Sequence, residues 1–382
     1  MRRPQIDLHR LLDDIRELVE TESPSTDLDA VARSAEVVAH LGAAHLGVPP
    51  ERIVVDGVTH LRWRFGPGPH VLLLAHHDTV WPHGTLERIP YAVTDGVLRG
   101  PGCFDMLAGL VMALHTVAAL PAPDGVCLLV TGDEELGSPS SRALIEAEAR
   151  EASAVLVLEA SVGDGDLKTA RKGTSMYEVE VVGRAAHAGL EPDKGVNATI
   201  ELAHQVPAVA ALADPSAGTT VTPTSASAGT TLNTVPGAAR FTVDVRAWSA
   251  AEQERVDAGM RALEPALEGA KLVVHGGINR PPLEESMSAR LFDRAVDVAT
   301  RLGLPVPGQA AVGGASDGNF TAGVGTPTLD GLGAVGGGAH AEDEHVLVDR
   351  LADRTILLHG LLQGLLEELV AGRPSDGSRD RP

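Results

Sequence analysis

The chain is poor in cysteine and in positive charge, and it has no long apolar run. Two cysteines, Cys103 and Cys127, are too few for a disulfide framework, which favours a reducing cytoplasm. The 52 acidic residues outnumber the 31 Lys and Arg, and the net charge of -21 argues against nucleic acid or an anionic membrane as a partner. No stretch approaches the roughly 18 apolar residues of a membrane span. Polar residues from Gln5 onward interrupt any secretory signal.

The length of 382 residues and the hydrophobic content of 43% predict a globular protein of two domains. Three apolar runs, "VLLLAHHD", "GVCLLVTGD" and "SAVLVLEAS", are typical of buried strands, and residues 106–120 and 140–152 between them are typical of helices. This β-α-β-α-β order predicts an α/β fold with a mostly parallel mixed sheet and helices on both faces. The polar end "GRPSDGSRDRP" predicts a disordered tail.

The pattern changes from about Gly173 onward. Residues 175–183 and 239–248 alternate apolar and polar side chains, as strands with one exposed face do. Helical segments 195–213 and 249–267 are interleaved with them. We therefore expect an inserted α+β domain over residues 174–284, with residues 1–173 and 285–382 forming a discontinuous first domain.

Polar residues end each of the three buried strands. Ligands gather outside the carboxyl ends of parallel strands, so these residues are candidates as a set. Carboxylates at this density repel one another unless a cation neutralises them, which indicates a metal site with two ions. The set is His76, His77 and Asp78, then Asp133, Glu134 and Glu135, then Glu159, with Asp105 from the loop "RGPGCFDM".

The strand period separates the two neighbouring histidines. Residues 76 and 78 fall on one face of the strand and residue 77 on the other. A ligand histidine usually has its second nitrogen held by a carboxylate. We therefore predict that His76 is a ligand with Asp78 as its orienting partner, and that His77 is packed or hydrogen-bonded.

The motifs "HHDTVWP", "GPGCFDM", "TGDEELGS", "LEAS", "AAHAG" and "GGGAHAEDE" occur in the order found in a family of zinc-dependent peptidases and acylases. The chain resembles this family, which includes bacterial glutamate carboxypeptidase, aminoacylase, acetylornithine deacetylase and succinyl-diaminopimelate desuccinylase, from about residue 10 to 370. The resemblance implies a zinc-peptidase-like catalytic domain and a ferredoxin-like inserted domain that serves as a lid and forms a homodimer. It also implies a cis peptide bond after Asp105.

The resemblance implies a role for each candidate at the strand ends. Glu134 would be the general base, Asp78 would orient His76, and Asp105 would bridge two Zn²⁺ ions per chain, with Co²⁺ or Mn²⁺ as possible substitutes. From the residues alone, either Glu134 or Glu135 could face the metal. The metal ligands implied by the family are His76 and Glu159 for one ion, Glu135 and His340 for the other, and Asp105 for both.

Further residues match positions that the family uses for substrate. His187 would reach the scissile carbonyl oxygen across the dimer, and Arg246 and Arg280 suit a substrate carboxylate because guanidinium groups bind it bidentately. The loop from Gly313 to Phe320 resembles one that closes on the carboxylate end through backbone amides. The expected substrate-binding residues are Asn233, Arg246, Arg280, Gly314, Ser316, Asp317 and Asn319.

The chain also departs from the family pattern. Leu107 stands where the family usually has lysine, and Ala160 follows Glu159 where proline is common. Gly331-x-Gly333-x-x-Gly336 formally matches a dinucleotide fingerprint, but no helix follows it, so we expect no nucleotide site.

Three classes of function stay open at this point. The first is a di-zinc amidase that removes a C-terminal, glutamate-like residue from a peptide or N-acyl conjugate. The second is an N-acyl-amino-acid deacylase with the same mechanism, and the third is a non-catalytic binding protein. The complete ligand set argues against the third class, and the sequence does not separate the first two.

Overall fold

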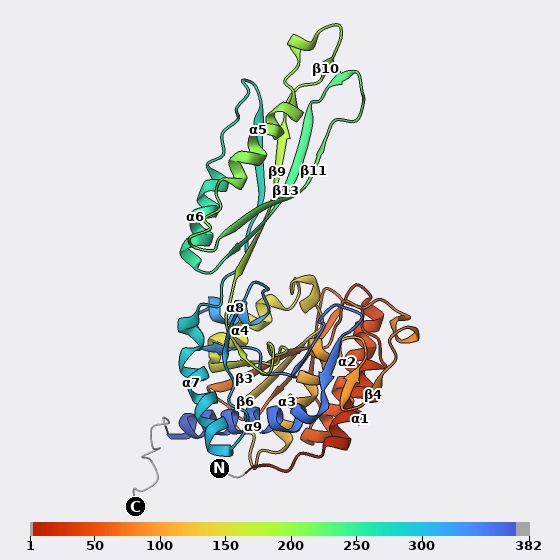
Figure 1. Ribbon diagram of the computed structural model, residues 1–382, viewed down its shortest axis with the longest axis vertical. Coiled ribbons are helices and arrows are strands. Elements are labelled where there is room, and N and C mark those ends of the chain that lie inside the picture. The colour runs from red at the N-terminus through yellow and green to blue at the C-terminus, as the bar shows by residue number, and fades with distance from the viewer. Residues whose placement is uncertain (1–2, 372–382) are drawn as a thin grey trace, which may run out of the picture. The chain divides into compact units, whose positions relative to one another are not determined.

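The structure is a computed structural model that describes residues 3–371, and the tail predicted to be disordered lies outside them. It forms two compact units (Figure 1). Unit 2 comprises Ala170–Glu284 and Val312–Ala315, and unit 1 comprises the rest.

The unit boundaries differ from the sequence-based ones at two places. The inserted unit begins four residues earlier, at Ala170 rather than 174, and it also takes in Val312–Ala315. The hydrogen bonds give the reason: Lys172 N donates to Val312 O at 3.1 Å, and the Arg171 guanidinium donates to Gly314 O at 3.0 Å. β8 (Leu167–Arg171) pairs with β15 (Gln309–Val312), and the boundary passes through both strands.

Unit 1 is built on a six-stranded mixed sheet, which confirms the α/β prediction. The β6–β3, β3–β7 and β7–β16 pairs are parallel, and the β1–β2 and β2–β6 pairs are antiparallel. In spatial order the strands are β1 (Glu51–Val55), β2 (Val58–Arg64), β6 (Val126–Thr131), β3 (His70–His76), β7 (Ala152–Val157) and β16 (Thr328–Leu329).

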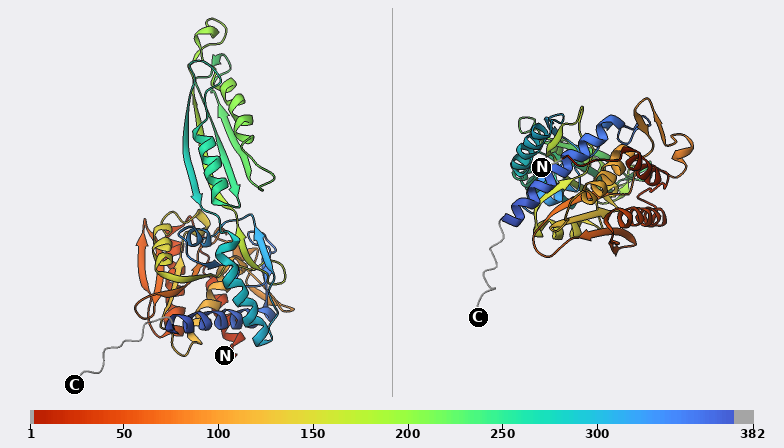
Figure 2. Two further views of the ribbon diagram at one scale, coloured as in Figure 1. Left: turned by 90° about the vertical axis from the view of Figure 1, so that its left-hand side faces the viewer. Right: turned by 90° about the horizontal axis from the view of Figure 1, so that it is seen from below.

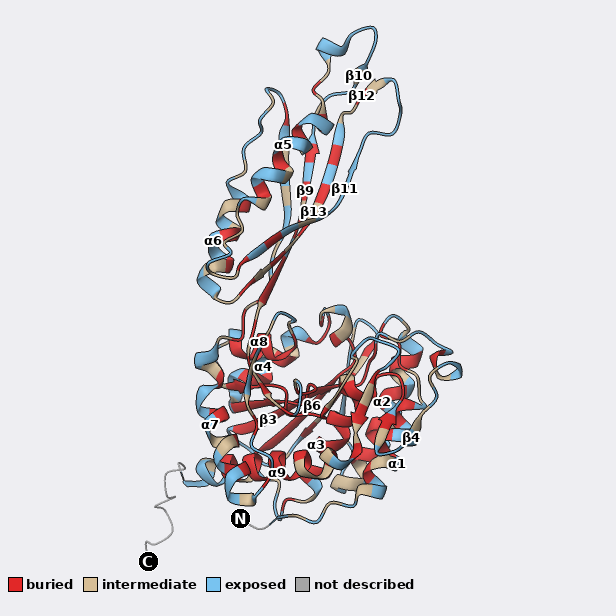
Figure 3. Ribbon diagram, in the orientation of Figure 1, coloured by how far each residue is buried: buried red, intermediate tan, exposed pale blue. Residues whose placement is uncertain are grey.

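Helices cover both faces of this sheet because its central strands are apolar on both sides. Leu73 of β3 packs in the larger core, which includes residues of α1, α2, α3, α7 and α9. Leu72 and Leu74 point the other way, into the smaller core with α4 and α8. Figure 3 shows the central strands β3 and β6 buried along their length. The helices are α1 (Leu8–Val19), α2 (Leu28–Leu46), α3 (Ala108–Ala118), α4 (Arg142–Glu151), α7 (Glu285–Leu302), α8 (Gly318–Gly323) and α9 (Val348–Ala371).

A second, small antiparallel sheet of unit 1 carries the loops around the site. Its order is β17 (Gly336–Gly337), β18 (His345–Leu347), β5 (Val97–Arg99) and β4 (Ala92–Thr94). The long helix α9, dark blue in the two views of Figure 2, packs on α3 and α7. None of the helices in residues 3–371 combines the length and the apolarity that crossing a membrane requires.

Unit 2 has the β-α-β-β-α-β order of a ferredoxin-like domain. Its sheet is antiparallel, in the order β11-β13-β9-β14. Alternate residues such as Val179 and Phe241 are buried in a core to which α5 and α6 contribute. The elements are β9 (Gly173–Val182), β10 (Ala186–His187), α5 (Ala198–Ala210), β11 (Thr220–Ala228), β12 (Thr234–Val235), β13 (Ala238–Ala247), α6 (Ala250–Arg261) and β14 (Lys271–Arg280).

Candidate active site

The topology of the sheet brings the predicted ligands to one edge. β6, β3 and β7 are parallel neighbours, so their carboxyl ends lie side by side. His76 is the last residue of β3, Glu135 lies in the short helical turn Glu134–Leu136 after β6, and Glu159 follows β7. Asp105 comes from the irregular segment Cys103–Leu107, and His340 from the loop before β18.

Two groups of potential metal ligands share Asp105. In the first, His76 Nε2 lies 3.5 Å from Asp105 Oδ1 and 3.7 Å from Glu159 Oε1. In the second, His340 Nε2 lies 3.3 Å from Asp105 Oδ2 and 3.2 Å from Glu135 Oε1. Ligand atoms about 2.0–2.3 Å from a tetrahedral zinc stand roughly 3.3–3.8 Å apart. The two groups therefore have the spacing of ligand sets, with Asp105 offering one oxygen to each.

The tautomer of His76 fits a metal ligand. Its Nδ1 lies 2.9 Å from the backbone oxygen of Asp78 and so donates a proton to it. Its Nε2 is buried and has no hydrogen-bond partner within residues 3–371. Nε2 therefore faces Asp105 and Glu159, and its lone pair would point at a metal ion between them once the Nε2 proton is displaced, which is the geometry that a ligand imidazole needs.

The electrostatics of the cluster also favour a cation. Burial opposes a charge on His76, but the neighbouring carboxylates of Asp105 and Asp78 outweigh it and hold the pKa of His76 well above its usual value. Hydrogen bonds to Asp105 and Glu135 raise the pKa of His340 to about 10. Burial would raise the pKa of Asp105, yet its hydrogen bonds with the two histidines keep that pKa far below the usual range. In the protein alone, protons therefore occupy the positions where metal ions would bind.

Asp78 has a wider role than the predicted one. Its backbone oxygen, rather than its carboxylate, makes the shorter contact to His76, since the nearer carboxylate oxygen stands 3.4 Å from Nδ1. The carboxylate accepts hydrogen bonds from the backbone nitrogens of Glu134 and Glu135, each at 3.2 Å, and from the Ser25 hydroxyl at 2.7 Å. Asp78 thus ties the turn that carries both glutamates to the end of β3.

Glu344 is a site residue that the sequence analysis missed. Its fully buried carboxylate accepts hydrogen bonds from the backbone nitrogens of Gly102, Phe104 and Asp105 at 2.9–3.0 Å, and from Trp81 Nε1 at 2.8 Å. It therefore holds the segment that presents Asp105, whose peptide bond to Met106 is cis, as the resemblance implied. The motif "GGGAHAEDE" contains Glu344, but nothing in the sequence distinguishes it from the acidic residues beside it.

Other polar residues at the strand ends make hydrogen bonds outside the ligand cluster. His77 is buried, with Nδ1 near the Ser34 hydroxyl and Nε2 near the Thr59 carbonyl oxygen, so it does not point at the cluster. Asp133 accepts hydrogen bonds from the hydroxyls of Ser140 and Ser141.

The glycines of the formal dinucleotide fingerprint have a packing role. A Cβ on Gly333 would lie 2.2 Å from Leu158 O and 2.8 Å from Glu159 O, so only glycine fits against the strand end that carries Glu159. Gly331 has a φ of 77°, which favours glycine.

In the predicted substrate loop, the side chains are buried and internally bonded. Ser316 donates to Asp330 at 2.6 Å, and Asn319 Oδ1 accepts from the backbone nitrogen of Ser316 at 2.9 Å. Asp317 accepts from the hydroxyls of Ser138 and Thr131. These contacts occupy the side chains and fix the shape of the loop. Substrate binding by Gly314, Ser316, Asp317 and Asn319 would therefore use backbone groups, and this binding stays a prediction.

Unit 2 brings two of the predicted residues together at one end. β10 pairs with β12, which places His187 opposite Thr234, and Ala188 N donates to Asn233 O at 2.9 Å. His187 and Asn233 are both exposed. Elsewhere in the unit, Arg246 makes a bidentate ion pair with Asp244 at 2.9 Å, and Arg280 is buried.

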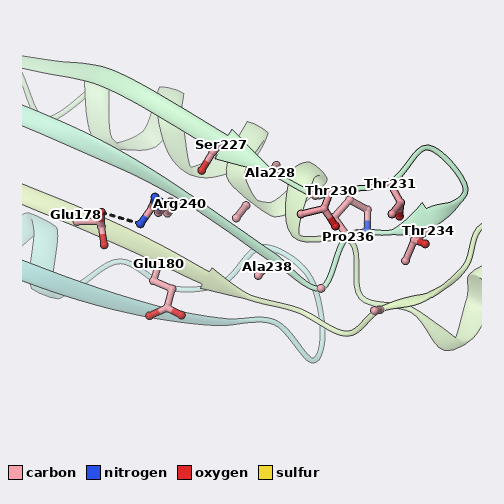
Figure 4. A pocket seen from close by; sticks show the side chains of 14 residues that line it. Glu178, Glu180, Ser227, Ala228, Thr230, Thr231, Thr234, Pro236, Ala238 and Arg240 are labelled. Carbon is pink, nitrogen blue, oxygen red and sulfur yellow. Dashed lines mark ion pairs between the residues drawn. The ribbon is translucent and has the colours of Figure 1, made fainter.

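A hollow of about 510 Å³ also lies within unit 2 (Figure 4). It is lined by small and hydroxyl-bearing side chains, and by Arg240 and Glu178, whose charged groups face each other at 3.9 Å. It contains none of the candidate metal ligands, so we do not assign chemistry to it.

Paired imidazole–carboxylate groups at the carboxyl ends of a parallel sheet are the kind of site that metal-dependent hydrolases use. Residues 72–364 match the model of peptidase family M20/M25/M40, and the chain belongs to this family. It is therefore an enzyme of the peptidase and amidohydrolase class.

Two relatives of this chain are named for different activities. Over 313 residues it is 32% identical to carboxypeptidase G2 of Pseudomonas sp. (strain RS-16), covering 78% of this chain and 74% of the relative. It is also 30% identical over 360 residues to succinyl-diaminopimelate desuccinylase of Azoarcus sp. (strain BH72), covering 85% and 90%.

Solved structures share the fold across nearly the whole chain. Aminopeptidase PepT from Bacillus cereus ATCC 10987 superposes with a TM-score of 0.70 at 20% identity, covering 94% of this chain and 99% of that one. An M20 family metallo-carboxypeptidase from Sulfolobus solfataricus gives a TM-score of 0.69 at 16% identity, with the same coverage. At these identities the likeness concerns the fold.

Proposed function

We propose that this chain is a di-zinc amidohydrolase that releases a carboxylate-bearing, glutamate-like amino acid from a peptide or N-acyl conjugate. The observation that carries the proposal is the pair of ligand groups that share Asp105, one with His76 and Glu159 and the other with Glu135 and His340. When bound, two zinc ions polarise a carbonyl group and lower the pKa of a water molecule towards 7.

Glu134 is the proposed general base. It is buried beside the cluster, and its negative charge contributes to the raised pKa of His76. Its backbone is fixed by Asp78, which also fixes Glu135. This supports a division of labour in which Glu135 faces the metal, while Glu134 takes a proton from the attacking water and delivers it to the leaving nitrogen.

His187 is proposed to stabilise the oxygen of the scissile carbonyl. Its Nδ1 accepts hydrogen bonds from the backbone nitrogens of Gly189 and Leu190, both at 3.1 Å. A ring whose Nδ1 accepts carries its proton on Nε2, so the exposed edge of His187 is a hydrogen-bond donor. A donor is what a developing oxyanion needs. We propose that His187 serves the active site of the second subunit of a homodimer.

The carboxylate end of the substrate is assigned to Asn233, Arg246, Arg280 and the loop from Gly313 to Phe320. Arg246 already holds a carboxylate bidentately, that of Asp244, so it has the geometry for a substrate carboxylate in exchange. The likeness to carboxypeptidase G2 supports this substrate class. The desuccinylase relatives favour the second candidate, an N-acyl-amino-acid deacylase of the same mechanism.

A substrate panel separates the two candidates. Zinc-loaded protein is assayed with N-acyl and peptidyl conjugates in which the released amino acid and the acyl group are varied independently. The carboxypeptidase assignment predicts that kcat/KM depends mainly on the released amino acid, with glutamate preferred. A rate that depends mainly on the acyl group would favour the deacylase. No hydrolysis of any conjugate by metal-loaded protein would contradict both.

A further inference from the structure

A second set of metal-ligating residue types lies at the opposite end of the central sheet. His70 is the first residue of β3, whereas His76 is the last. Cys127 is in the neighbouring strand β6, and Glu148 is in α4. One ligand atom from each lies within 4.8 Å of the others, and the three residues are at most 4% exposed.

The spacing of this group is that of a ligand set. Glu148 Oε2 stands 3.7 Å from His70 Nε2 and 3.5 Å from Cys127 Sγ. A third cluster of the same kind, in α1, α2 and α3, gives the contrast: Asp14 Oδ2 lies only 2.7 Å from His45 Nε2 and 2.6 Å from His115 Nε2. Those shorter distances are hydrogen bonds between nitrogen and oxygen. Of the longer ones, the Cys127–Glu148 contact is a thiol hydrogen bond, and both distances match the catalytic groups and the roughly 3.3–3.8 Å expected around zinc.

His70 supplies the second, independent observation. Both of its ring nitrogens are buried, and neither makes a hydrogen bond of normal geometry within residues 3–371, although the backbone of Gly68 lies close enough to act on the ring. Buried polar groups are nearly always paired, so an imidazole with two unpaired nitrogens needs an explanation. Burial lowers the pKa of His70, so the ring is neutral and offers a lone pair next to the carboxylate and the thiol.

A divalent cation would balance the charges around this group. Arg62 pairs with Glu51 and Glu148, and Arg64 pairs with Glu148 and Glu151. The three carboxylates carry three negative charges and the two guanidinium groups two positive ones, which leaves one negative charge. The Cys127 thiol adds no charge, because burial raises its pKa and keeps it neutral. A divalent ion that displaces the thiol proton to solvent would bring the cluster to neutrality. The two arginines are about a quarter exposed, at 24% and 30%, and Arg64 Nη1 lies 3.5 Å from Glu148 Oε2, the oxygen that faces His70 and Cys127.

We propose that His70, Cys127 and Glu148 form a metal site, separate from the catalytic cluster, for a thiophilic divalent cation such as Zn²⁺. The imidazole nitrogen, the thiolate and one carboxylate oxygen are the protein ligands, and the thiol proton is released on binding. Because the ligands come from β3, β6 and α4, the bound ion would join α4 to the amino-terminal end of the parallel strands.

Cobalt substitution gives a direct test, because thiolate ligation of Co²⁺ produces a sulfur-to-metal charge-transfer band in the near ultraviolet. The catalytic groups offer only nitrogen and oxygen, so they cannot produce this band. Full-length protein saturated with Co²⁺ should show the band, and Cys127→Ser should lose it together with one equivalent of bound metal per chain. Cys103→Ser is the matched control, since it removes the other buried thiol, and it should keep both.

His70→Gln provides a second variant if Cys127→Ser does not fold, and it should weaken or shift the band while leaving turnover intact. The proposal would be overturned by a folded protein that shows no charge-transfer band at saturating Co²⁺. A band that survives Cys127→Ser, or equal metal content in the wild type and the folded variants, would overturn it as well.

Discussion

His76 and Glu159 of unit 1 are held differently from His187 and Asn233 of unit 2. In unit 1, His76 and Glu159 are less than 10% exposed, and buried groups such as Asp78 and Glu344 fix the segments around them. In unit 2, His187 and Asn233 are exposed, near an exposed Leu190 and a fully exposed Leu232. Figure 3 shows the same contrast, because the central strands β3 and β6 of unit 1 are buried and the strands β9 and β13 of unit 2 alternate.

The difference indicates a division of function. Burial and a surrounding hydrogen-bond network preorganise groups for chemistry, so unit 1 has the features of the reacting centre. Exposed donors and apolar side chains are available to a substrate or to another subunit, so unit 2 has the features of a recognition element.

The strongest effect is expected in unit 1 at the general base. Glu134→Gln should keep its metal but lower kcat by about 10²–10⁴-fold, because the amide cannot take the proton of the water. Glu135→Ala is the matched neighbour and should instead lose metal. Steady-state kinetics and elemental analysis distinguish the two variants. Near-normal turnover in Glu134→Gln would reverse the assigned roles.

A change in unit 2 should also act on catalysis, but through the other subunit. His187→Ala should lower kcat by about 10²-fold, since it removes one donor to the developing oxyanion. When His187→Ala and Glu134→Gln chains are mixed, half of the dimers are heterodimers with one complete site. Mixing should therefore restore about a quarter of the wild-type rate. No recovery after verified subunit exchange would place the action of His187 within its own chain.

Glu344 tests how far the surrounding network supports the reacting centre. Glu344→Gln keeps the shape of the side chain. The carboxylate accepts four hydrogen bonds with its two oxygens, whereas the amide group has only one acceptor oxygen. Metal affinity should fall by about 10–100-fold, as for other residues that orient ligands. Metal titration of the variant measures this, and excess metal should restore much of the turnover. An unchanged metal affinity would limit Glu344 to a folding role.

The smallest catalytic effect is expected at Asp14, whose cluster resembles the active site only in composition. Burial would raise the pKa of Asp14, but hydrogen bonds to His115 and His45 outweigh it and lower that pKa. This stability is fully present above the ordinary carboxyl pKa of about 4 and is lost as pH falls towards the folded value. Asp14→Asn should therefore cost about 1–3 kcal/mol at pH 7 and progressively less in acid, with turnover unchanged. Urea unfolding of the wild type and the variant at pH 7 and at a pH below about 4 checks this. An equal loss of unfolding free energy at both pH values would contradict it.

The buried strands and the residues that end them were predictable because they carry local signals. Apolar runs marked β3, β6 and β7, and their parallel order placed His76, Glu135 and Glu159 at one edge. The alternation in β9 and β13 likewise revealed the second unit.

Features that depend on distant or backbone contacts were not predictable. The sequence did not predict β11, because this strand is polar, mostly exposed and interrupted by a register shift after Pro223. Glu344 acts on backbone nitrogens some 240 positions away, and the return of Val312–Ala315 to unit 2 depends on single hydrogen bonds. The sequence favoured a carboxylate as the partner of His76, whereas the closer contact is the backbone oxygen of Asp78.

The metal content of the Cys127→Ser variant decides whether the cluster at the strand ends binds two metal ions, because this variant lacks the thiol of the other proposed site. We expect two zinc ions per chain, nearly none in the double variant that also carries Asp105→Ala, and turnover that chelation abolishes and zinc restores. Protein without metal that hydrolyses its substrate equally well before and after chelation would contradict it.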